Sequence, residues 1–248
     1  MCLIIVCKSA TKKLPRDVLE SVIEHNRDGW GISWKDPTLG RATCARSLHM
    51  RNFIDKFNEV QKFASPEFPV VAHCRMATHG AVSRENLHPF LINDKGERWF
   101  LFHNGVLPAY ASKTNACASD TGILVGHLKN IVSKNHGILR NQAVASLLEL
   151  CSGTGNRFVL VSPEGEATLM GSFHEDYDGF LLSNRYAYSR TPYLYGNNDS
   201  LISDINSYYK PKNGKNHVPY IPYSDHYSWE PAKETVRNDK CYIQAIKG

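Results

Sequence analysis

The sequence lacks the features that mark several large classes of protein. Its seven cysteines are scattered and form no C-x-x-C pair, which argues against a disulfide framework or a zinc knuckle and for a reducing compartment. No apolar run approaches the length of a membrane span, and the apolar stretch near the N-terminus is too short for a secretory signal. We therefore predict a cytoplasmic protein without a membrane segment.

Charge is not concentrated either. The chain has 29 Lys and Arg against 24 Asp and Glu, a net charge of +5 without a basic stripe, so the sequence gives little support to nucleic-acid binding. The mild excess of positive charge suits an anionic substrate or an acidic partner. No internal repeat, heptad or nucleotide-binding loop is present.

Apolar periodicity predicts an ordinary globular domain, since 42% of the 248 residues are hydrophobic. Period-two and continuous apolar runs predict strands at 2–7, 30–34, 41–47, 70–76, 90–93, 98–102, 157–161, 167–170 and 180–183. Helical spacing predicts helices at 15–25, 53–60, 121–132 and 141–151. With strands on both sides of a central helical pair, the pattern favours an α+β domain of stacked layers.

Cys2 is a candidate nucleophile because of its position. The initiator methionine is normally removed when a small residue follows, so we expect the mature chain to begin at Cys2. An α-amino group titrates about 2–3 units below a lysine ammonium and can act as a base near neutral pH. Nucleophile and base would then belong to one residue, the arrangement of N-terminal-nucleophile catalysis. Taken alone, Cys2 fits a buried structural cysteine better.

Residues 73–90 carry a second candidate group. Arg75 ends an apolar strand, where its guanidinium can hold a free carboxylate with two hydrogen bonds. Thr78 and His79 follow in a glycine-containing loop that could close over a ligand. A polar surface loop is the alternative interpretation. A metal site built from these histidines and Cys74 has no zinc-like spacing, and we predict no metal.

Two further motifs follow the strand at 98–102. Asn104 and Gly105 offer a side-chain amide beside a glycine N–H, a suitable pair of donors for an oxyanion, although Asn-Gly is also a common turn. Asp120 opens a helix, where it either caps the helix or holds a substrate ammonium.

In their order along the chain, these motifs resemble the glutaminase domain of class II glutamine amidotransferases, members of the Ntn-hydrolase superfamily, and particularly their small stand-alone bacterial type. The resemblance spans residues 2–190. It implies a four-layer αββα sandwich of two stacked, mostly antiparallel sheets. The matching residues are Cys2, Arg75-Met76-Ala77-Thr78-His79-Gly80, Asn86-Leu87-His88-Pro89, His103-Asn104-Gly105 and Ser119-Asp120-Thr121, with Asp28-Gly29-Trp30-Gly31-Ile32 as an early glycine-rich strand.

The resemblance also implies a role for each residue. Cys2 attacks the side-chain amide of L-glutamine with its own α-amine as base, and Asn104 with Gly105 stabilises the oxyanion. Arg75 binds the α-carboxylate and Asp120 the α-ammonium, while Thr78 and His79 line the adjacent loop. Synthase members usually have a bulky aromatic residue where this chain has Met76, which leaves open how the pocket closes. No cofactor is implied.

Three functions remain open from the sequence. The first is a glutaminase that passes ammonia to a partner synthetase on a separate chain, because no acceptor-side motif is present. The second is an Ntn hydrolase for another γ-glutamyl or acyl amide, and the third a catalytically silent binding module. The segment 191–248, rich in Tyr, Pro, Asn, Asp and Ser, is predicted to be an extension packed on the domain or extending from it.

Overall fold

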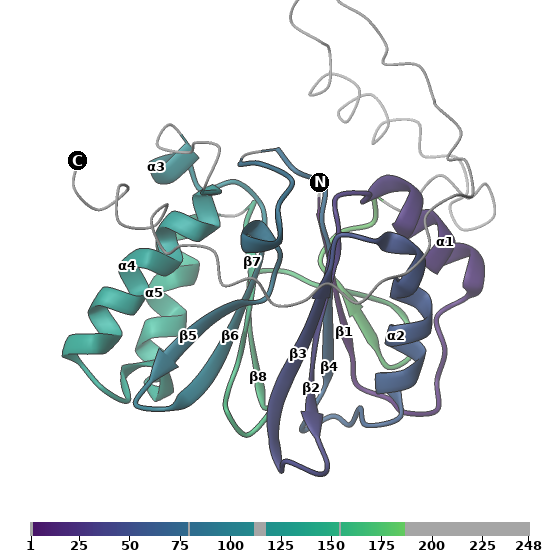
Figure 1. Ribbon diagram of the computed structural model, residues 1–248, viewed down its shortest axis with the longest axis horizontal. Helices are drawn as coiled ribbons and strands as arrows, with labels where there is room; N and C mark the ends of the chain where they lie inside the picture. Colours follow the sequence, from purple (N-terminus) through teal and green to yellow (C-terminus); the bar gives the residue numbers. More distant parts are fainter. Residues whose placement is uncertain (1, 79, 112–117, 154, 187–248) are drawn as a thin grey trace, which may run out of the picture. The chain divides into compact units, whose positions relative to one another are not determined.

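The computed structural model of the chain describes residues 2–78, 80–111, 118–153 and 155–186. In this part the strands form a six-stranded sheet, β3-β2-β4-β1-β10-β9, and a four-stranded sheet, β5-β6-β7-β8 (Figure 1). The strands are β1 (Leu3–Cys7), β2 (Trp30–Asp36), β3 (Arg41–Ser47), β4 (Val70–Cys74), β5 (Phe90–Asp94), β6 (Glu97–Asn104), β7 (Arg157–Val161), β8 (Ala167–Met170), β9 (His174–Tyr177) and β10 (Phe180–Leu182). The α-helices are α1 (Arg16–His25), α2 (Phe53–Gln61), α3 (Pro108–Ala111), α4 (Asp120–Lys134) and α5 (Gln142–Ser152).

Strand β1 lies inside the six-stranded sheet and is buried along its whole length. Successive side chains of a strand point to opposite faces, so β1 serves two layers. Leu3 and Ile5 pack against the helices α1 and α2, whereas Ile4 and Val6 pack against the other sheet. A strand buried on both faces explains why residues 2–7 form a continuous apolar run rather than an alternating one.

Helices cover the outer face of each sheet. On one side, α1 and α2 contribute their apolar stripes to a core with β1, β2 and β4. On the other side, α4 and α5 pack over β5, β6 and β7, and Figure 1 shows these two helix pairs on opposite sides of the paired sheets. Between the sheets, Phe100, Phe102 and Val159 meet Ile4 and Val71.

The predicted α+β, four-layer αββα sandwich is confirmed. All strand pairings in the described part are antiparallel. The elements differ from the prediction in several places, among them the short helix α3, which was not predicted. Strand β4 ends at Cys74 instead of residue 76, and β9 has no counterpart among the predicted strands. His174–Tyr177 is a polar edge strand, so it lacks the apolar pattern on which the prediction depends.

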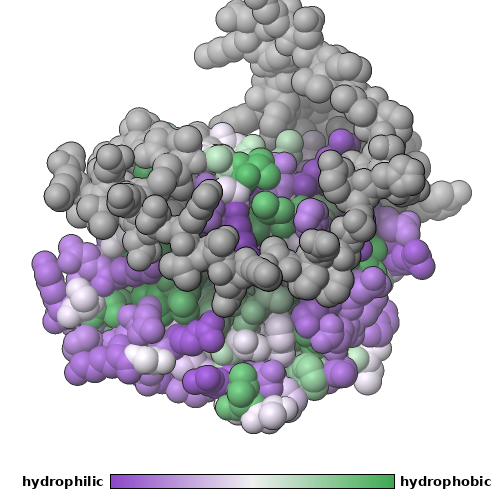
Figure 2. Space-filling model, viewed as in Figure 1, coloured by the Kyte–Doolittle hydropathy of each residue, from purple (hydrophilic) through white to green (hydrophobic). Residues whose placement is uncertain are grey.

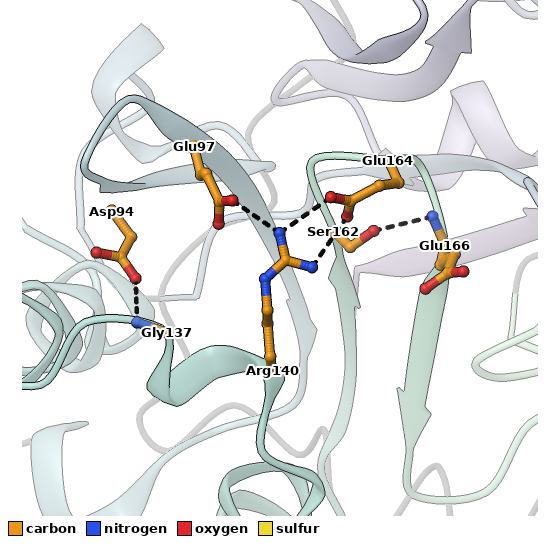
Figure 3. Close-up of polar contacts among 7 residues, drawn as sticks. All are labelled: Asp94, Glu97, Gly137, Arg140, Ser162, Glu164 and Glu166. Atoms are coloured by element: carbon orange, nitrogen blue, oxygen red, sulfur yellow. Dashed lines mark hydrogen bonds and ion pairs between the residues drawn. The ribbon is translucent and has the colours of Figure 1, made fainter.

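The end of the four-stranded sheet opposite Asn104 is held by surface contacts. Arg140 Nη2 lies 2.8 Å from Glu97 Oε1 and 2.9 Å from Glu164 Oε1 (Figure 3). Glu164 and Glu97 raise the pKa of Arg140 above its ordinary value. Exposed ion pairs of this kind stabilise a fold only slightly, but these two join the β5–β6 and β7–β8 hairpins.

The described surface is mixed in character. In the view of Figure 2, hydrophilic residues cover most of both flanks, and hydrophobic residues form smaller patches between them. Among the described residues, no helix has the length and apolar character needed to cross a membrane. The predicted extension at 191–248 lies outside the described residues.

Candidate active site

Cys2 immediately precedes β1, and its thiol is half-buried against the loop that follows β4. The N–H of Met76 donates to Cys2 Sγ at 3.3 Å, and Sγ in turn donates to the Met76 carbonyl at 3.3 Å. Burial raises the pKa of the Cys2 thiol, and the contact with Met76 and the charge of Arg75 oppose this only in part. A thiol with a raised pKa needs a base before it can attack an amide.

Arg75 leaves β4 with only 3% of its surface exposed. Its Nη1 donates to the Ala81 carbonyl at 3.0 Å and its Nη2 to the Gly80 carbonyl at 3.4 Å. Burial lowers the pKa of Arg75, whereas Cys2, Asp28 and Asp120 act in the opposite direction. The positive charge of Arg75 therefore interacts favourably with the Cys2 thiol and with both of these carboxylates.

Asp120 is the first residue of α4 and is buried. Ser119 caps the helix, because its hydroxyl accepts from Gly122 N–H at 3.1 Å. The carboxylate of Asp120 instead accepts from Leu107 N–H at 2.9 Å and from Thr121 N–H at 2.8 Å. It thereby ties the start of α4 to the turn that follows Asn104 and Gly105.

Asn104 ends β6 with its side chain buried, and its Nδ2 donates to Ser183 Oγ at 2.8 Å. Gly105 follows with φ of +149°, and a Cβ at this position would lie 2.2 Å from Asn156 Oδ1. Only glycine fits both the backbone angle and the space.

His103 fixes the strand end beneath this pair. Its Nε2 lies 2.7 Å from Asn156 Oδ1, and its Nδ1 lies 2.7 Å from Thr121 Oγ1. Burial lowers the pKa of His103, so the ring is neutral, donates to Asn156 and accepts from the Thr121 hydroxyl. The contact joins β6 to α4.

The loop between β4 and β5 borders the thiol. Ala77 N–H donates to Asp28 Oδ2 at 2.6 Å, and Asn86 Nδ2 donates to the Ala81 carbonyl at 3.1 Å. Asn86 Oδ1 also accepts from Ser119 N–H at 3.0 Å, so the loop is anchored to the start of α4. Thr78 lies exposed in this loop, and His79 lies outside the described residues.

The fold thus brings the predicted residues together from separate elements. Cys2, Arg75 and Asp120 interact electrostatically, and Asn104 is connected through Ser183 to the strand that follows Cys2. No role was predicted for Asn156, Ser183 or Asn184, and no local pattern marks them. Asp28 was named only as part of the early glycine-rich strand.

Two other histidines are buried between the sheets and the loop. The rings of His73 and His88 stand 4.0 Å apart, centroid to centroid, and neither makes a hydrogen bond of good geometry within the described part of the chain. Burial lowers the pKa of His73 to about 3 and that of His88 well below its ordinary value. Among the described residues, no group of three or more His, Cys, Asp or Glu side chains is placed to hold a metal ion.

More than half of the chain also matches a known protein family. Residues 18–154, more than half of the chain, match the family model described as "Glutamine amidotransferases class-II". The matched range includes Arg75, Asn104 and Asp120 and begins after Cys2.

Individual relatives are matched over shorter stretches. The YafJ protein of Escherichia coli (strain K12), provisionally described as a glutamine amidotransferase, is 36% identical over 87 residues, which are 35% of this chain and 33% of that protein. A protein of Haemophilus influenzae (strain Rd) with a similar provisional description is 40% identical over 48 residues, 19% of this chain and 16% of that protein. The match thus spans a third or less of these relatives.

Solved structures of similar fold have low sequence identity. Glutamine phosphoribosylpyrophosphate (PRPP) amidotransferase from B. subtilis is 20% identical, with a TM-score of 0.49 over 76% of this chain and 43% of that chain. A structure described as the allosteric regulatory enzyme of purine biosynthesis is 18% identical, with a TM-score of 0.46 and the same coverage.

Proposed function

Because the chain belongs to the class II glutamine amidotransferases, we propose that it hydrolyses the side-chain amide of L-glutamine through a thioester on Cys2 and releases glutamate and ammonia. One observation carries the proposal. The Cys2 thiol lies against the Met76 backbone beside Arg75, at the edge where Asn104 is held through Ser183 to the start of β1.

In this proposal, removal of Met1 gives Cys2 a free α-amine. The thiol proton passes to that amine as sulfur attacks the amide carbon, and the carbonyl oxygen becomes an oxyanion. The C–N bond then breaks, and the α-ammonium returns the proton to the departing ammonia. Water attacks the thioester and releases glutamate, which restores the thiol. A base on the nucleophilic residue itself can take the proton as the thiol attacks.

The oxyanion is assigned to Asn104 and Gly105. A carboxamide nitrogen carries two N–H groups, and Ser183 accepts one of them. The second remains for the substrate oxygen, together with the N–H of Gly105. Donors that are fixed before the reaction stabilise the oxyanion without reorganisation during the chemical step.

Arg75 and Asp120 suit the two charged ends of a free amino acid. The guanidinium carries a positive charge and five N–H donors that can bind a carboxylate, and it is held in place by the carbonyls of Gly80 and Ala81. The carboxylate of Asp120 accepts two backbone N–H groups and keeps lone pairs for an ammonium. We assign the α-carboxylate to Arg75, the α-ammonium to Asp120 and the edge of the pocket to Thr78 and His79.

This charged pair favours a substrate with a free α-carboxylate and α-ammonium over an acyl amide that lacks them. Another γ-glutamyl amide presents the same two ends, so kinetics with glutamine and with that amide separate the two substrates. A silent binding module has no use for a nucleophilic thiol and predicts no glutamate release from glutamine.

We further propose that residues 2–190 are the amidotransferase domain and that ammonia passes to a synthetase on a separate chain in the cytoplasm. Support comes from the family model, which matches residues 18–154, and from the scattered cysteines, which suit a reducing compartment. The extension at 191–248 is the segment that we assign to partner contact.

Glutamate release tests the proposal. The wild type, Cys2→Ala and Cys44→Ala are each incubated with glutamine. Cys44 is a suitable control because it is also half-buried, and burial also raises its pKa. We expect activity in the wild type and in Cys44→Ala, and none in Cys2→Ala. Equal activity in all three proteins would refute the assignment of Cys2.

A further inference from the structure

After β10 ends at Leu182, two side chains take over part of the hydrogen bonding to the start of β1. Ser183 N–H still donates to the Ile4 carbonyl at 3.0 Å, but Ile4 N–H donates to Ser183 Oγ at 2.8 Å rather than to a backbone carbonyl. Asn184 Nδ2 then donates to the Cys2 carbonyl at 2.7 Å. The start of β1 is therefore bonded to the side chains of Ser183 and Asn184 on this edge.

The Ser183 hydroxyl also reaches the second sheet. Its oxygen accepts from Asn104 Nδ2 at 2.8 Å as well as from Ile4 N–H. Ser183 is completely buried and Asn104 is 3% exposed. A hydroxyl oxygen has two lone pairs, and here one accepts from each sheet. Ser183 thus connects the strand that follows the nucleophile to the strand that carries the oxyanion donors.

We propose that Ser183 and Asn184 are positioning residues, which act through different partners. Ser183 orients the amide of Asn104, and Asn184 holds the backbone of Cys2. This inference rests on the proposed function, in which Asn104 stabilises the oxyanion and Cys2 is the nucleophile. Neither residue touches the reacting atoms.

The orientation of the Asn104 amide is not fixed by the side chain itself. The terminal torsion of an Asn side chain has a broad energy profile, so the amide plane is not fixed by its rotamer alone. An oxyanion donor must lie within a few tenths of an ångström of its productive position. Because Ser183 Oγ is held by Ile4 N–H, it is a fixed acceptor that selects one amide orientation and leaves the second N–H of Nδ2 free for the substrate.

Substitution of Ser183 by Ala tests the first half. Loss of the acceptor should lower kcat by about tenfold or more, while KM for glutamine changes by less than about twofold. Alkylation of Cys2 by iodoacetamide, which forms no oxyanion, should keep its wild-type rate and shows that the site is still folded. Ser162→Ala is the matched control, since Ser162 is buried and its hydroxyl accepts from Glu166 N–H at 3.2 Å (Figure 3).

A double-mutant cycle separates positioning from a general structural effect. If Ser183 acts through Asn104, the variant with both Ser183→Ala and Asn104→Ala should have the kcat of Asn104→Ala alone. Asn184 acts on Cys2 instead, so Asn184→Ala should lower kcat by a factor that multiplies with the effect of Asn104→Ala.

The possible results separate a failure of the proposed function from a failure of the inference about Ser183 and Asn184. A wild type that releases no glutamate from glutamine overturns both the proposed function and this inference. An active wild type whose kcat is unchanged in Ser183→Ala overturns the inference alone. So does a double variant in which the effects of Ser183→Ala and Asn104→Ala multiply.

Discussion

Gly105 and Asn156 approach each other so closely that a Cβ on Gly105 would lie 2.2 Å from Asn156 Oδ1. The same Oδ1 accepts from His103 Nε2 at 2.7 Å. This close approach holds the Asn104–Gly105 turn against the segment before β7. A side chain added at Gly105 should therefore disturb the turn.

Gly105→Ala should lower the free energy of unfolding by on the order of 3 kcal/mol, because the new Cβ meets Asn156 and the φ of +149° is strained for alanine. Urea unfolding measures the change. Gly96→Ala is the control, since Gly96 also has a positive φ, of +90°, but a Cβ on Gly96 would have no neighbouring atom within 4 Å. Equal losses in the two variants would show that the contact with Asn156 is unimportant.

Asn104→Ala should lower kcat for glutamate release by on the order of a hundredfold or more, with a smaller change in KM, because the lost N–H serves the transition state. Steady-state kinetics give both values. Asn93→Ala is the matched control. Asn93 lies in the β5–β6 hairpin and accepts from Gly96 N–H at 2.9 Å. A kcat near the wild-type value in Asn104→Ala would remove Asn104 from the oxyanion site.

Arg75→Ala should raise KM for glutamine by about tenfold or more, since a charge-assisted hydrogen bond to the substrate carboxylate is lost. Arg75 also binds the carbonyls of Gly80 and Ala81, so loss of the loop contact is a second effect to be separated. Arg46→Ala provides the comparison, because Arg46 also donates to a loop carbonyl, that of Leu87 at 3.2 Å. If both variants raise KM equally, Arg75 only supports the loop.

Acid should destabilise the fold through the buried histidines. His73 has a pKa of about 3 in the folded chain against an ordinary value of 6.5, so between these values the unfolded chain binds a proton that the folded chain does not. The free energy of unfolding then falls as the pH drops from 6.5 toward 3. In His73→Phe this part of the pH dependence should disappear, as measured by urea unfolding at several pH values. An unchanged slope would show that His73 does not bind its proton on unfolding.

Periodicity predicted most of the fold because the elements are defined by burial. The run at residues 3–7 and the stripes of α1, α2 and α4 each face a core. Strand β9 was missed because it is a polar edge strand. The predicted strand at 70–76 ends early because Met76 turns its N–H and carbonyl to the Cys2 thiol instead of to a neighbouring strand.

Some residues of the candidate site could not be predicted from the sequence, because their contacts form only in the folded chain. Arg75, Asn104 and Asp120 stand in short local motifs, so the sequence alone identifies them as candidates. Ser183 acquires its position only when β10 pairs with β1 and the two sheets stack. A contact between residues 79 positions apart, at the ends of strands in different sheets, leaves no local pattern.

The central claim is that Cys2 becomes the N-terminal nucleophile. Mass spectrometry of the purified chain, before and after incubation with a glutamine analogue that carries an electrophilic ketone, tests it most directly. The account predicts a chain without Met1, one adduct on Cys2, and protection of Cys2 by excess glutamine. Retention of Met1, or an adduct on Cys7 or Cys74 instead of Cys2, would contradict it.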